Sequence, residues 1–162
     1  MDSQGASPAR KVALTEWNFW SAATSHGRYV EPADGAHVLF AAAVLRGLVA
    51  LGDAVELANY YSLLNWFGAI QVNGPNANAT AVADLFRLYG SILPAYVVPC
   101  QLDIDSLEVT CFETEDSARR WLVLENWSVD DEASVDLEAE WVPVAVDVLA
   151  RLVGSGRVCR RR

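Results

Sequence analysis

A long apolar run in the first third of the chain places the strongest constraint on the fold. Ala36–Leu51 is apolar except for His37, Arg46 and Gly47. A membrane-crossing helix needs about 20 predominantly apolar residues, so this shorter run predicts a helix inside a folded protein. A helix that is apolar on nearly every face must be covered on most sides. The chain can supply that cover, because 52% of its residues are hydrophobic and only 20% are charged.

The segments around this helix alternate between strand and helix patterns. Val12–Trp17 is short and apolar, which is typical of a buried strand, and Val55–Asn65 is a second candidate strand. Asn73–Asn78 consists of turn residues. Thr80–Leu93 repeats its apolar residues on one helical face. The order strand, helix, strand, helix predicts parallel βα units.

The pattern changes at Pro94, after which short strands follow one another. The predicted strands are Tyr96–Ile104, Leu107–Thr114, Arg120–Ser128 and Ser134–Trp141. The last of them alternates apolar and acidic residues on its two faces, and turn residues separate all of them at the spacing of a β-sandwich. We therefore predict a boundary near residues 93–96. The predicted parts are a flexible leader at 1–10, an α/β part at 11–94, a β-sandwich at 95–153 and a basic tail at 154–162.

The net charge argues against a nucleic-acid partner. The formal charge is −9, from 12 Lys and Arg against 21 Asp and Glu. Binding to phosphates needs clustered cations. The one basic cluster, Arg157 with Arg160–Arg162, is predicted to be a solvated tail without a partner. We expect neither nucleic acid nor a membrane among the partners.

The cysteines and histidines predict no metal site. The chain has 3 cysteines (Cys100, Cys111 and Cys159) outside any CxxC pair, and only 2 histidines. Cys100 and Cys111 are expected to be small buried apolar residues, and His37 a satisfied histidine on its apolar helix. Residues 1–10 lack the apolar core of a secretory signal. The absence of paired cysteines favours the cytoplasm.

The residues with most chemical content follow the first predicted strand, in the segment TEWNFW at residues 15–20. Glu16 is a carboxylate at the end of an apolar strand, and in a (β/α)8 barrel that end opens into the active site. Trp17 and Trp20 could stack on sugar rings, and Asn18 could bind a hydroxyl group or orient the carboxylate. The alternative is a surface glutamate beside core aromatics, because one glutamate makes no active site.

TEWNFW resembles the nucleophile motif of the α-L-arabinofuranosidases of glycoside hydrolase family 51, in which E-W-N-x-W ends the seventh barrel strand. The resemblance continues in register through EPADGAHVLFAAAVL (31–45) and DAVELANYYSLLNWFGAI (53–70), which are similar to the following helix, the eighth strand and its loop. The helix around 85–89 and WLVLENWS (121–128) are similar to the last barrel helix and the C-terminal sandwich. Together these segments cover roughly residues 10–150.

The resemblance implies a fold and a reaction. The fold would be the last two βα units of a (β/α)8 barrel followed by a jelly-roll-like antiparallel β-sandwich. The reaction would be the retaining hydrolysis of terminal α-L-arabinofuranosyl groups from hemicellulose or pectin oligosaccharides. In that mechanism one carboxylate forms a covalent glycosyl-enzyme, and a second one about 5 Å away acts as acid and then base. No metal or cofactor is implied.

The resemblance also implies roles for single residues. Glu16 matches the nucleophile, Asn18 an orienting or substrate-binding residue, and Trp17 and Trp20 the walls of the sugar site. Asn65 matches the asparagine of the loop after the eighth strand and would support the sugar site. As an alternative, Asn65 could cap the end of the strand. Ser62 stands where many members have a glutamine close to the bound sugar, so the sugar contact of that glutamine is not expected here.

The acid/base glutamate of the family has no counterpart in the chain. It belongs to a G-N-E-type motif that does not occur here. Glu31 lies in the lead-in to the helix, Glu56 near the start of a strand and Glu108 in the predicted sandwich, so none is a suitable substitute. About 250 residues make a whole barrel. The chain alone is therefore expected to be inactive. Its expected partners are an arabinose-containing oligosaccharide and either the missing N-terminal part of the barrel or a second copy of the chain in a homo-oligomer.

Two other functions stay open at this point. The chain could be a non-catalytic sandwich module that contacts carbohydrate or partner subunits, and it would then bind glycans after Glu16→Ala. It could also be a structural remnant without activity. The sequence does not specify the linkage, the group that leaves, or the oligomeric state.

Overall fold

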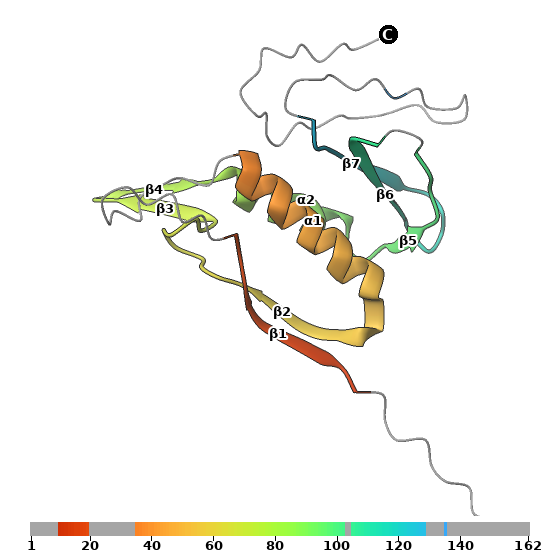
Figure 1. Cartoon of the computed structure of the whole chain (residues 1–162), viewed down its shortest axis with the longest axis horizontal. Helices are drawn as coiled ribbons and strands as arrows, with labels where there is room; N and C mark the ends of the chain where they lie inside the picture. Colours follow the sequence, from red (N-terminus) through yellow and green to blue (C-terminus); the bar gives the residue numbers. More distant parts are fainter. Residues whose placement is uncertain (1–9, 20–34, 103–104, 129–134, 136–162) are drawn as a thin grey trace, which may run out of the picture.

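The computed structural model of the chain describes residues 10–19, 35–102, 105–128 and 135 (Figure 1). Strand β1 (Val12–Trp17) is followed by helix α1 (Gly35–Leu51), the short 3-10 turn η1 (Gly52–Ala54) and strand β2 (Val55–Tyr60). β1 and β2 pair in parallel, with Val12 opposite Val55 and Trp17 opposite Tyr60. The predicted strand–helix–strand unit is therefore present.

β2 ends at Tyr60, short of the predicted end at Asn65, and an irregular loop follows it. Asn65, Trp66 and Phe67 all have positive φ angles, of 53°, 47° and 64°. Non-glycine residues adopt this left-handed region only rarely, and it cannot continue a strand. The predicted strand to Asn65 is thus wrong beyond Tyr60, where a loop takes over.

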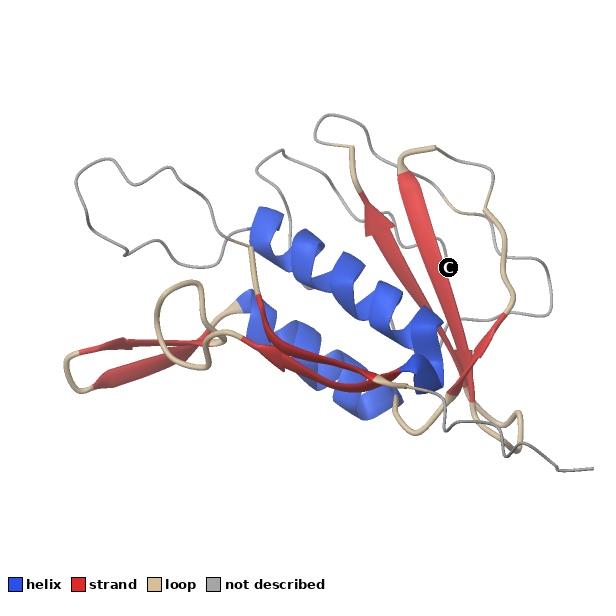
Figure 2. Cartoon of the chain, turned by 60° about the horizontal axis from the view of Figure 1, so that its bottom comes forward, coloured by secondary structure: helices blue, strands red, loops and turns tan. Residues whose placement is uncertain are grey.

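A small hairpin and a second helix follow. Strands β3 (Ile70–Asn73) and β4 (Asn76–Ala79) pair in antiparallel fashion. They turn at Gly74, whose φ of +57° suits glycine, so the predicted turn at 73–78 is tighter than expected. Helix α2 (Ala81–Ile92) lies within the predicted helical range. Figure 2 shows the hairpin extending away from the two helices.

The remaining strands form one antiparallel sheet. Its order is β5 (Tyr96–Val98), β6 (Leu107–Glu113) and β7 (Arg120–Asn126). Each begins where a strand was predicted, although β5 covers only three residues. The predicted strand Ser134–Trp141, the leader at 1–10 (except residue 10) and the basic tail lie outside the described residues.

The two helices lie between the β1–β2 pair and the three-stranded sheet (Figure 1). One cluster of buried side chains joins all three layers: Trp17, Val38, Ala41, Ala42, Val82, Leu85, Tyr89, Ile92, Phe112 and Val123. This cluster crosses the predicted boundary at residues 93–96. The barrel-plus-sandwich fold and its division stay predictions, because the described residues form sheets of two, two and three strands.

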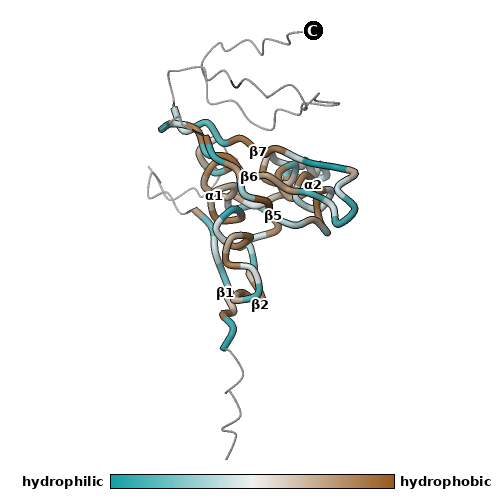
Figure 3. The backbone as a smooth tube through the Cα atoms, turned by 90° about the vertical axis from the view of Figure 1, so that its right-hand side faces the viewer, coloured by the Kyte–Doolittle hydropathy of each residue, from teal (hydrophilic) through white to brown (hydrophobic). Residues whose placement is uncertain are grey.

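Helix α1 is apolar along most of its length (Figure 3). Of its four buried residues, His37, Val38, Ala41 and Ala42, the three apolar ones belong to the core cluster. The stretch Gly35–Ala54 is also the one span among the described residues that is long and apolar enough to cross a membrane by length and composition. Core helices of soluble proteins pass the same test.

Candidate functional site

The carboxyl ends of the two parallel strands meet at one place and define the candidate site. Trp17 is the last residue of β1 and lies opposite Tyr60, the last residue of β2. The Tyr61 N–H continues this pairing by donating to the Trp17 carbonyl at 3.0 Å. The residues that follow both strands are therefore held close together, as expected for neighbouring parallel strands.

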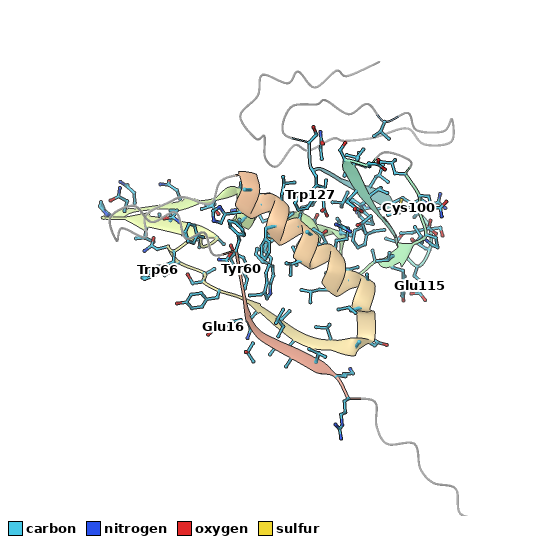
Figure 4. All side chains as sticks on the ribbon, in the orientation of Figure 1. Glu16, Tyr60, Trp66, Cys100, Glu115 and Trp127 are labelled. Atoms are coloured by element: carbon cyan, nitrogen blue, oxygen red, sulfur yellow. The ribbon has the colours of Figure 1, made fainter. Side chains whose placement is uncertain are left out.

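Glu16 and Trp17 differ in burial at the end of β1, where the pairing with β2 shifts register between Leu14 and Trp17. Glu16 is exposed, and Figure 4 shows it on β1, away from the helices. Trp17 is only 8% exposed and lies in the core. Its ring packs edge-on against Tyr60, with centroids 4.9 Å apart. Trp17 thus has a packing position here, unlike the sugar-wall position predicted for it.

Asn18 uses its carboxamide to hold the backbone at the strand ends. Its Nδ2 donates to the Tyr61 carbonyl, and its Oδ1 accepts from the Phe19 N–H at 2.6 Å. These bonds fix the direction in which the chain leaves β1. They make Asn18 a backbone anchor next to Glu16, and they occupy the side chain that was predicted to orient a carboxylate or a sugar.

Tyr60 is a residue of this site that the sequence did not single out. Its hydroxyl donates to the Phe67 carbonyl at 2.7 Å, and its ring packs against Trp17 and Phe86. Burial raises the pKa of Tyr60 to about 12, against an opposing hydrogen bond with Asn18. Tyr60 therefore stays protonated at neutral pH and acts as a fixed donor. The sequence signal that could have identified Tyr60 was an aromatic residue at the end of β2, matching Trp17 at the end of β1.

Asn65 belongs to the loop that leads to the hairpin. Its Oδ1 accepts from the Val72 N–H at 2.8 Å, and its N–H donates to the Ile70 carbonyl at 2.8 Å. A Cβ at Gly68 would lie 2.5 Å from the Asn65 carbonyl oxygen, so only glycine fits there. Asn65 shapes this loop instead of capping β2. Trp20, the other predicted sugar-wall residue, lies outside the described residues.

Neither Glu56 nor Glu108, the two candidate substitutes in the described part of the chain, lies beside Glu16. Glu56 pairs with Lys11 at 2.8 Å near the start of both strands, at the opposite end from Glu16. Glu108 pairs with Arg46 at 3.3 Å. Glu31 lies outside the described residues. The described part of the chain also has no group of three or more His, Cys, Asp or Glu side chains that could hold a metal ion.

A cavity of about 630 Å³ lies beside this site, between the end of β2, the hairpin and α2. Tyr60, Ile70 and Phe86 are among its lining residues, and Arg87 is the one charged side chain there. The Arg87 guanidinium pairs with Asp84 on the same helix. The cavity is therefore lined mainly by apolar side chains, and its charged residue is already paired.

A second charged cluster joins α1 to the three-stranded sheet. The Nε of Arg46 lies 3.3 Å from Oε1 of Glu125, a residue that is 3% exposed. Glu108 lies opposite Glu125 in the pairing of β6 and β7. Burial raises the pKa of Glu125, Arg46 lowers it and Glu108 adds to the rise. An arginine inside an apolar run was the sequence signal for such a partner.

Comparisons with known proteins identify no relative of this chain. No family model, no curated protein and no solved structure matches the chain.

Proposed function

We propose that the chain is the C-terminal part of a retaining α-L-arabinofuranosidase and that Glu16 is its nucleophile. The observation that carries the proposal is the position of Glu16. It is an exposed carboxylate near the carboxyl end of β1, beside a second strand that runs parallel to it. In a (β/α)8 barrel that end of the strands faces the substrate. The resemblance of TEWNFW to the family motif supplies the reaction class.

Glu16 would attack the anomeric carbon of a bound arabinofuranosyl group. The glycosidic bond breaks, the leaving oxygen takes a proton from a general acid, and a glycosyl ester forms on the Glu16 carboxylate. Water, deprotonated by the same second group, then releases arabinose with retained configuration. The second carboxylate would come from the barrel strands that this chain lacks. No metal or cofactor takes part.

Asn18 and Tyr60 would serve this reaction as positioning residues. Asn18 ties the exit of β1 to the exit of β2 through the Tyr61 carbonyl. Tyr60 supports the same junction through its hydrogen bond to the Phe67 carbonyl and its ring contact with Trp17. A nucleophile works best when its backbone is rigid, because a small misplacement slows the reaction strongly.

Complementation tests the proposal. The chain would be mixed with the first six βα units of a family 51 arabinofuranosidase, which carry the acid/base glutamate, and assayed with 4-nitrophenyl α-L-arabinofuranoside. The chain alone should be inactive, because loss of a general acid costs about 10²–10⁴-fold. The mixture should release nitrophenol, Glu16→Gln should abolish the release, and Glu56→Gln should not. Equal activity of the Glu16→Gln mixture would refute the proposal.

The second candidate is a non-catalytic module that contacts carbohydrate through the three-stranded sheet. Tyr96 and Trp127, at two edges of this sheet, are 62% and 43% exposed. Exposed aromatic rings can stack on sugars. Binding of arabino-oligosaccharides that persists in Glu16→Ala and is lost in Trp127→Ala would favour this candidate over the enzyme.

A further inference from the structure

Two cysteines lie close to each other where the pairing of β5 and β6 ends. Val98, the last residue of β5, lies opposite Cys111 on β6, and Cys100 follows two residues after Val98. Figure 4 labels Cys100 at this end of the sheet. The Sγ of Cys100 lies 3.9 Å from the carbonyl oxygen of Val109, which is two residues before Cys111 on β6. Cys100 therefore lies beside the stretch of β6 that contains Cys111.

The two thiols share a cavity and differ in access. Both are free. Both also line a cavity of about 260 Å³ between α1 and the sheet. Cys100 is half-buried, whereas Cys111 is only 7% exposed. A small molecule that enters the cavity thus meets Cys100 first.

We propose that Cys100 and Cys111 form a disulfide when the protein meets hydrogen peroxide, and that this bond ties the short edge strand β5 to β6. Cys100 is the residue that reacts with the peroxide, and Cys111 is the residue that resolves the product. The inference is independent of the proposed glycosidase function, because neither cysteine belongs to the site around Glu16.

The reaction balances with the peroxide as the oxidant. The Cys100 thiolate attacks one peroxide oxygen, the O–O bond breaks, and the second oxygen leaves as hydroxide, which takes up a proton to become water. Cys100 is then a sulfenic acid. The sulfur of Cys111 attacks the sulfur of Cys100, the S–O bond breaks, and a second water leaves with the thiol proton. Two thiols have lost two electrons, and peroxide has become two waters.

The test uses the full chain with Cys159→Ser, so that only the proposed pair remains. It is treated with hydrogen peroxide, blocked with an alkylating reagent, cleaved after Glu108 and measured by mass spectrometry. Cleavage there separates the two cysteines unless a disulfide joins them. We expect the joined peptides, lighter by two hydrogens. Two alkylated cysteines, or a sulfinic acid on Cys100 with an alkylated Cys111, would overturn the proposal.

Single variants on the same background assign the two roles. With Cys111→Ser, Cys100 should accumulate as a sulfenic acid that dimedone traps. With Cys100→Ser, Cys111 should stay reduced because it is buried. Trapping on Cys111 and not on Cys100 would contradict the assignment.

A comparison of native and unfolded chain separates a built site from chance proximity. The disulfide should form several-fold faster in buffer than in concentrated urea, because the fold holds both cysteines at one cavity. The same comparison can be made on the unaltered chain, where pairing of Cys100 with Cys111 should exceed pairing of either with Cys159. An equal or higher rate in urea would refute the proposal.

Discussion

Among the residues that the structure describes, Arg46 is the cation that pairs with both Glu108 and Glu125, and Arg46→Met removes it. In the structure Arg46 Nη1 lies 3.3 Å from Glu108 Oε2, and its Nε lies 3.3 Å and 3.4 Å from the two oxygens of Glu125. The two glutamates are opposite each other on β6 and β7. Without Arg46, a buried carboxylate would remain next to a second one with no counter-charge.

The size of the effect follows from the burial of the partners. Breaking a buried ion pair by removing one member costs about 3–5 kcal/mol. Arg46 is 30% exposed and Glu108 is 50% exposed, so solvent screens part of this cost. We therefore expect Arg46→Met to lower the free energy of unfolding by about 3 kcal/mol at neutral pH, the lower end of that range.

The pH dependence gives the sign of the effect. The pKa of Glu125 is raised in the folded protein, so the folded state binds this proton more tightly than the unfolded state. Stability from this group is present below the unfolded pKa and is lost as the pH rises through the folded pKa. In Arg46→Met that pKa should rise further. The deficit of the variant should therefore shrink as the pH is lowered from neutral toward 5.

Urea unfolding measured by tryptophan fluorescence is a suitable assay, because the chain has 6 tryptophans. Arg87→Met is the matched control, since Arg87 is 68% exposed and pairs with Asp84 on its own helix. It should change stability by less than about 0.5 kcal/mol. Arg46→Met with Glu125→Gln should recover much of the loss. An Arg46→Met effect as small as the control, or no recovery in the double variant, would refute the reasoning.

Other predictions concern the site and its loop. Tyr60→Phe removes the hydrogen bond to the Phe67 carbonyl and should lower the free energy of unfolding by about 1 kcal/mol, measured by urea unfolding; an unchanged midpoint would contradict that bond. Gly68→Ala places a Cβ against the Asn65 carbonyl oxygen and should lower the free energy of unfolding by about 1–3 kcal/mol in the same assay. Gly90→Ala, at a helical glycine with open space around it, is the control and should not lower it. Lys11→Met removes only an exposed pair, so its thermal midpoint should match that of the unaltered chain; a large fall would show that the pair matters more than its exposure indicates.

Local patterns were enough to locate most of the helices and strands. The 3.6-residue repeat of α2 and the short apolar run of β1 are local signals, and both elements lie within their predicted ranges. The end of β2 could not be located in this way. Asn65 tolerates a positive φ, but Trp66 and Phe67 rarely adopt one, and here the hairpin and Tyr60 hold the loop.

The candidate site also has features that the sequence predicts and features that it does not. Glu16 at a strand end can be predicted from the sequence. The burial of Trp17 could not, because β1 and β2 shift register between Leu14 and Trp17, so that both of these residues reach the core. The roles of Asn18 and Tyr60 depend on residues far along the chain, such as the Tyr61 carbonyl, 43 positions away from Asn18. Such partners have no local signal. Arg46 inside an apolar helix does indicate a partner, but its identity as Glu125, 79 positions away, comes only from the fold.

Covalent trapping of Glu16 tests the central claim most directly. The complemented enzyme would be incubated with an activated 2-fluoro arabinofuranoside, which slows hydrolysis of the glycosyl-enzyme, and the peptide with residues 12–18 would be analysed by mass spectrometry. A retaining mechanism with Glu16 as nucleophile predicts one fluoro-arabinosyl ester on Glu16, absent in Glu16→Gln. An ester on another carboxylate, or turnover of unfluorinated substrate with no ester on Glu16, would contradict it.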